Sequence, residues 1–100
     1  MKFEWDVKKE QINIKKHKVT FEQASFVFSD PFSLSMYDPD HSEDEDRYIL
    51  IGKSQNEVIL TVVHTFRDSN GIEIVRVISA RKATKKESKA YQKSLFIKKS

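Results

Sequence analysis

Arginine and histidine side chains supply the chemistry that this sequence could perform. Arg47, Arg67 and Arg81 each fall at the start or the end of a segment rich in Ile and Val. A guanidinium group binds phosphate oxygens in a bidentate manner and stabilises the charge that develops during phosphoryl transfer. Histidine is the side chain that titrates nearest neutral pH, so His17 and His64 are candidates for moving a proton. These residue types suffice for RNA cleavage by attack of a 2′-hydroxyl group on its own phosphate.

Two of these residues also have a structural explanation. Arg47 directly follows the acidic run 43–46 and could pair with it, and His64 lies in an apolar segment, where a histidine is more often part of the core. His41, next to the acidic run, could hold a cation only adventitiously, because no histidines stand at metal-ligand spacing and the chain has no cysteine. We therefore expect no metal site and no cofactor. Glycine-rich phosphate loops are excluded, because the chain has only two glycines.

Charge is distributed unevenly along the chain. Residues 1–18 carry six lysines against three acids, residues 19–80 four basic residues against eleven acids, and residues 81–100 eight basic residues against one acid. The three segments thus have net charges of +3, −7 and +7, which together give the +3 of the whole chain. This pattern favours one surface for a polyanion and another for a basic partner, although lysine-rich ends can also serve solubility alone.

Length and composition indicate one folded domain, residues 1–100. This length supports one modest core, and seven Phe, three Tyr and one Trp argue against disorder. The N-terminal residues are charged and lack the apolar core of a signal peptide. No apolar stretch approaches the roughly 20 residues of a membrane span. With no cysteine to form disulfides, the sequence predicts a soluble, cytoplasmic protein without a membrane segment.

The hydrophobic pattern predicts two helices, a sheet and a final helix. Asp6 is a suitable N-cap for the first helix, and Thr20–Gln23 and Thr84–Glu87 form capping boxes for the other two. The predicted elements are helices at 5–18 and 19–31, a weak strand at 32–40, strands at 47–52, 57–66 and 72–80, and a helix at 83–95 before a frayed tail. The fold class is therefore α+β, with helices covering one face of an antiparallel sheet of three or four strands.

The register of the predicted meander leaves two arrangements open for a site. With a three-residue loop at 68–70, Arg67 and Arg81 share a face but lie near opposite ends of the hairpin, too far apart for one phosphate. If the preceding hairpin places Glu45 opposite His64, these two residues form one possible cluster with Arg67. The alternative cluster consists of Arg81, Lys82, His17 and the last helix.

Three segments, in order along the chain, resemble a known protein family. The stretches FEWDVKKEQINIKKHKVTFEQASFVFSDP (3–31), HSEDEDRYILIG (41–52) and ISARKATKKESKAY (78–91) are similar to BrnT toxins. BrnT proteins are ribonuclease toxins of type II toxin–antitoxin pairs and have a RelE-like fold. The resemblance covers nearly the whole chain, from Phe3 to about Tyr91.

This resemblance implies RNA cleavage by internal 2′-hydroxyl attack, without a metal ion, and inhibition of translation and growth. By analogy with RelE-like enzymes, Arg67 and Arg81 would stabilise the phosphorane while a His or Glu moves the proton. The catalytic candidates are Arg67, Arg81, His17, His64 and Glu45. The RNA-binding candidates are Lys16, Arg47, Lys82 and Tyr91, the last by stacking on a base.

The resemblance also implies a protein partner. A BrnA-like antitoxin would neutralise the toxin by direct binding and would contact operator DNA through its own DNA-binding domain. A toxin homodimer within a toxin–antitoxin heterotetramer is expected. The chain departs from the family pattern at Lys18, where many members have glycine, and at Phe66, where a carboxylate is usual. A non-catalytic RNA- or protein-binding module is the alternative.

Overall fold

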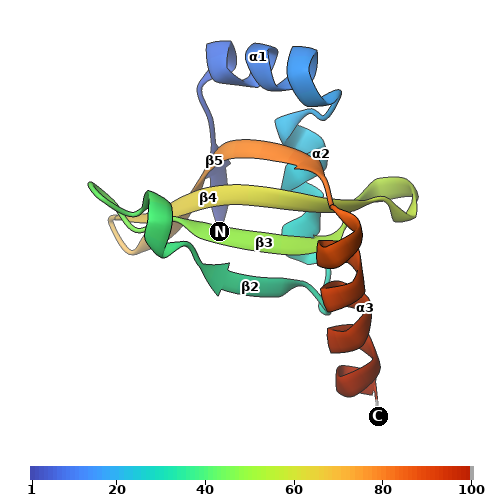
Figure 1. The fold of residues 1–100 in the computed structure, drawn as a ribbon. Coiled ribbons are helices and arrows are strands. Elements are labelled where there is room, and N and C mark those ends of the chain that lie inside the picture. The colour runs from blue at the N-terminus through green and yellow to red at the C-terminus, as the bar shows by residue number, and fades with distance from the viewer. Residues whose placement is uncertain (100) are drawn as a thin grey trace.

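A computed structural model describes residues 1–99 of the chain, which form one five-stranded sheet with helices against it (Figure 1). The helices are α1 (Val7–His17), α2 (Phe21–Phe26) and α3 (Lys85–Lys99), and the strands are β1 (Lys2–Glu4), β2 (Leu34–Tyr37), β3 (Tyr48–Lys53), β4 (Ile59–Ser69) and β5 (Ile72–Lys82). The strand order is β1-β5-β4-β3-β2. The predicted α+β class is therefore confirmed. No helix within residues 1–99 is long and apolar enough to cross a membrane.

The predicted helix starts are confirmed. The Asp6 side chain accepts hydrogen bonds from the first turn of α1. The capping box of Thr20 and Gln23 opens α2, and that of Thr84 and Glu87 opens α3, each with both reciprocal hydrogen bonds. The prediction of a frayed tail at 96–100 is wrong for residues 96–99, because α3 continues to Lys99. Residue 100 lies outside the described residues.

Three features of the sheet differ from the predictions. β1 is an additional strand that pairs parallel with β5, and its three residues are too few to show a period in the sequence. The β4–β5 hairpin turns over two residues, Asn70 and Gly71, rather than three; both have positive φ, as that tight turn requires. In the β3–β4 pair, Tyr48 rather than Glu45 lies opposite His64. The predicted registers were therefore wrong.

The core lies between the sheet and the segment that contains α2. Phe21, Ala24 and Val27 are fully buried against side chains of β3, β4 and β5. A separate contact holds α1 against the sheet, between Asn13 of α1 and Ala80 of β5. The Asn13 amide donates to the Ala80 carbonyl oxygen at 2.8 Å and accepts from the Ala80 N–H at 3.1 Å. Asn13 therefore replaces a neighbouring strand along the part of β5 that β1 does not cover.

The opposite sheet face receives α3, so the prediction that the helices cover one face was wrong. Tyr91 of α3 is 1% exposed, and its hydroxyl donates to Asp30 Oδ2 at 2.6 Å. Asp30 also accepts from the backbone N–H groups of Phe32 and Lys53. The first half of α3 is thereby fixed against the sheet, while its C-terminal half extends past β2 (Figure 1).

Candidate functional site

A β-bulge in β5 brings Arg76 and Arg81 onto the same face of the sheet. Arg81 pairs with Thr61 of β4, and Arg76 pairs with Thr65. Ile78 is an extra residue of β5 between the partners of two consecutive β4 residues. In a regular strand, side chains five residues apart point to opposite faces, so the bulge is what aligns the two guanidinium groups.

Arg67 shares this face, which we call the arginine face and define by Arg67, Arg76 and Arg81. It is the face opposite α2. Arg67 lies six residues from Thr61, the partner of Arg81, on β4. Six strand residues span ~20 Å, so one phosphate group cannot contact both Arg67 and Arg81.

Glu87, in the first turn of α3, holds Arg81. Its two carboxylate oxygens accept from Arg81 Nη1 at 2.7 Å and from Nη2 at 2.9 Å. The same carboxylate accepts from the Thr61 hydroxyl and from the Thr84 N–H. The hydrogen bonds from Arg81 outweigh burial and lower the pKa of Glu87 to about 2. Arg81 is thus fixed in one orientation, yet its side chain remains 40% exposed.

Lys16 and His17 approach the same edge of the sheet from the end of α1. They line a shallow pocket together with Ile78 and Ser79 of β5. Ser79 precedes Arg81 by two residues, so it lies ~7 Å away along the strand. Lys16 is exposed and His17 is half-buried. The predicted cluster of Arg81, His17 and the last helix is therefore brought to one region of the fold.

Arg67 is paired with Glu4 of β1. Arg67 Nε and Nη2 donate to the two carboxylate oxygens at 2.7 and 3.0 Å. These bonds lower the pKa of Glu4, and the charge of Arg76 lowers it further. Arg76 was missed in the sequence because it lies within a strand; its signal was a charge inside an otherwise apolar run.

His64 lies on the core face, away from Arg67. Its imidazole is 1% exposed and is surrounded by the rings of Phe28, Tyr48 and Phe66. Burial lowers its pKa, which favours the neutral form of the ring. The structure does not bring His64, Arg67 and Glu45 together.

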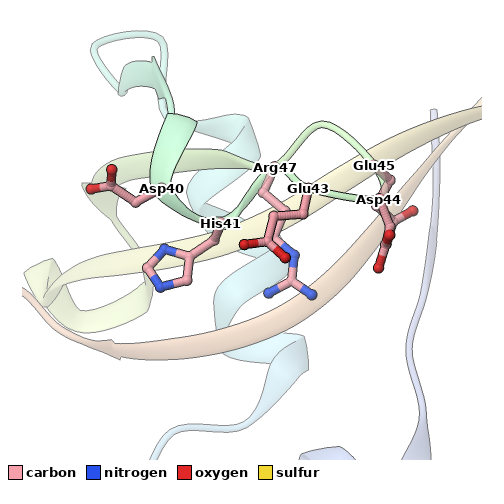
Figure 2. Close-up of a pocket in the computed structure, with 6 residues that line it drawn as sticks. All are labelled: Asp40, His41, Glu43, Asp44, Glu45 and Arg47. Carbon is pink, nitrogen blue, oxygen red and sulfur yellow. The ribbon is translucent and has the colours of Figure 1, made fainter.

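The acidic run forms a separate loop between β2 and β3. Figure 2 shows a pocket of this loop with Arg47 between His41 and the Asp44–Glu45 pair. The pocket measures about 290 Å³ and is lined by Asp40, His41, Glu43, Asp44, Glu45 and Arg47. Within residues 1–99, no three His, Asp or Glu side chains are grouped to hold a metal ion. The loop precedes β3, whereas Arg81 lies level with Ile51 towards the other end of that strand.

Two further candidates do not offer their side chains to RNA on the arginine face. The buried Tyr91 ring has no surface on which a base could stack while α3 is docked. Lys82 pairs with Leu60, a core residue, and so points to the opposite side of the sheet from Arg81.

The fold and this face define a small α+β protein with a row of arginines suited to a phosphate backbone. Residues 5–87 match the family described as "Ribonuclease toxin, BrnT, of type II toxin-antitoxin system". The chain is similar to the Brucella abortus ribonuclease toxin BrnT, whose structure was solved at 1.1 Å, with 30% identity and a TM-score of 0.61. That comparison covers 85% of this chain and 99% of the Brucella chain. No match was found among curated proteins.

The chain therefore belongs to the BrnT family of ribonuclease toxins, as the sequence motifs predicted. Membership implies RNA as the substrate and an antitoxin as the partner.

Proposed function

We propose that the protein is a metal-independent endoribonuclease toxin whose cleavage centre is Arg81, with His17 and Lys16 beside it. The observation that carries this proposal is the bidentate hold of Glu87 on Arg81, at 2.7 and 2.9 Å. A guanidinium that is fixed before substrate binds needs little reorganisation to stabilise a developing phosphorane charge. The exposed part of the Arg81 side chain is available to bind a phosphate group.

In this proposal His17 accepts the proton of a ribose 2′-hydroxyl, and the 2′-oxygen attacks the adjacent phosphorus. The bond from phosphorus to the 5′-oxygen then breaks, and the imidazolium returns its proton to that oxygen. The products are a 2′,3′-cyclic phosphate and a 5′-hydroxyl. Arg81 stabilises the phosphorane through N–H groups that it does not donate to Glu87, and Lys16 binds a neighbouring phosphate. Each step uses groups of this chain and of the RNA alone.

Cleavage of single-stranded RNA by the purified protein in EDTA tests the proposal. We expect cyclic-phosphate ends, and we expect Arg81→Gln to lose about a hundredfold or more in kcat. Lys8→Gln, which removes an exposed α1 charge away from the site, is the matched control and should cleave normally. Thermal melting of both variants shows whether the fold is kept. Intact RNA across free and ribosome-bound substrates would contradict the proposal.

The partner in this proposal is a BrnA-like antitoxin that binds the toxin directly within a heterotetramer built on a toxin dimer. The projecting half of α3 supports a protein contact, because Phe96 there is 76% exposed. Such a large exposed aromatic ring is typical of interaction surfaces. Induced expression should arrest growth, and co-expression of the antitoxin from the neighbouring reading frame should restore it.

A non-catalytic binding module remains the second candidate. The observation in its favour is that Arg67 and Arg81 both already have carboxylate partners, Glu4 and Glu87. Under this alternative, Arg81→Gln lowers the affinity for RNA or for a protein, and no cyclic-phosphate product forms with any variant.

A further inference from the structure

The arginine face carries a second group of cations at the end away from Arg81. Arg76 pairs with Glu4 in the β1–β5 register, and Glu4 in turn binds Arg67. We propose that Arg76 and Arg67 form a second phosphate subsite, so that the substrate is a single RNA strand whose backbone crosses the arginine face over several nucleotides. This inference rests on the proposed function and assigns Arg76 as a substrate-binding residue.

Arg76 differs from the other two arginines in its surroundings. It is exposed, and among the residues that the structure describes it has no ion-pair partner. Arg67 and Arg81 each give two N–H donors to a carboxylate. The bulge at Ile78 nevertheless aligns Arg76 with both of them. Arg76 is thus a guanidinium on the proposed substrate face whose donors are available for phosphate.

Glu4 marks where an anion binds at this subsite. Its two oxygens lie at 2.7 and 3.0 Å from Arg67 nitrogens, which is the geometry of a bidentate phosphate contact. The pair is solvent-exposed, with 53% of the Arg67 side chain accessible, and exposed ion pairs are weak. A phosphate oxygen can therefore replace the Glu4 carboxylate on Arg67 while Arg76 binds the same group. Glu4 acts as a competitor that limits RNA affinity.

The spacing separates this subsite from the cleavage centre. Arg76 and Arg81 pair with Thr65 and Thr61, four residues apart on β4, a span of ~13 Å. One phosphate held by N–H donors at about 2.8 Å cannot bridge that span from regular side-chain positions. The half-buried Val63 lies between them on the same face. An apolar surface between cations favours single-stranded RNA, whose unstacked bases and sugars can contact it. In a duplex the bases are paired and stacked and cannot make this contact.

Arg76→Gln tests the subsite, with Lys8→Gln as the charge-matched control. For long single-stranded RNA we expect KM to rise about tenfold with kcat nearly unchanged, and for a dinucleotide substrate we expect no effect. Binding of a non-cleavable 2′-O-methyl oligonucleotide should weaken with a salt slope smaller by about 0.7, the value for one lost phosphate contact. Glu4→Gln should tighten that binding, because the competing charge is removed.

The outcomes separate the subsite from the cleavage centre. If wild-type protein cleaves RNA and Arg76→Gln matches the control in KM and salt slope, the subsite is wrong and the proposed function stands. An equal loss on the dinucleotide would also overturn the subsite. If wild-type protein cleaves nothing while Arg76→Gln weakens binding and Glu4→Gln strengthens it, the subsite stands and the proposed catalysis fails. Melting temperatures close to wild type confirm that both variants fold.

Discussion

Glu87 and Arg81 join the last helix to the sheet through two hydrogen bonds, of 2.7 and 2.9 Å. The same carboxylate caps α3 through Thr84 and accepts from Thr61 of β4. One side chain thus fixes a helix start, a central strand and the arginine at the proposed cleavage centre. The N3 position of a capping box is Glu or Gln, and Glu87 occupies it in α3. The same residue therefore both starts the helix and holds Arg81 at the proposed cleavage centre.

Replacing Glu87 with Gln should change how stability depends on pH. The folded pKa of Glu87 is about 2, below its ordinary 4.5, so its contribution is complete above pH 4.5 and is lost as the pH falls towards 2. We expect Glu87→Gln to lower the free energy of unfolding by about 2 kcal/mol at neutral pH, a value reduced to allow for solvent around Arg81. On acidification, the free energy of unfolding of the variant should fall less than that of the wild type.

Urea unfolding at several pH values measures this effect. Glu57→Gln is the control, because Glu57 also pairs with a cation but on the exposed surface, where the loss should be small. Equal curves for Glu87→Gln and wild type between neutral and acid pH would contradict the assignment.

A second pH effect is expected at His64. Burial lowers the pKa of His64 in the folded protein below its ordinary 6.5. At a pH between the folded and the unfolded pKa, the unfolded chain therefore binds more protons than the folded protein. Stability should therefore fall as the pH drops below about 6.5. His64→Phe should reduce this fall, since the site is already lined by aromatic rings, and should leave RNA cleavage intact. Thermal melting at two pH values, with a cleavage assay, checks both parts; lost cleavage in a folded variant would return His64 to the catalytic candidates.

Lys18 is a position where glycine should be better. It follows α1 with φ 61° and ψ 30°, the left-handed conformation, and its N–H donates to the Ile14 carbonyl oxygen at 2.8 Å. Glycine adopts this conformation without a Cβ penalty, which explains its presence in the family pattern. We expect Lys18→Gly to gain about 0.5–1 kcal/mol in urea unfolding. Lys15→Gly, inside α1, should instead lower the free energy of unfolding by about 1 kcal/mol. A lower free energy of unfolding in both variants would refute the conformational argument.

Asn13 should be sensitive to truncation. It is buried and makes hydrogen bonds to Val19 and to both backbone groups of Ala80. Asn13→Ala leaves these groups without partners in the interior, so we expect a loss of about 3 kcal/mol. Gln11→Ala, an exposed change on the same helix, should stay within about 0.5 kcal/mol of wild type in the same urea titration.

The sequence by itself determined the local elements of this protein. Asp6, Thr20 and Thr84 mark helix starts because capping depends on residues within one turn. The ordered family motifs also indicated the BrnT family, which the comparisons confirmed. The arginines at the strand ends were visible as phosphate-binding candidates.

Only the tertiary structure decided which of these side chains meet. The bulge at Ile78 and the parallel strand β1 depend on partners far away in the chain, which leave no local pattern. A shift of one residue in register moves a side chain to the other face of the sheet, so the sequence left two clusters open, one with His64 and Arg67 and one with Arg81 and His17. The pairing of strands, rather than the identity of the residues, created the arginine face.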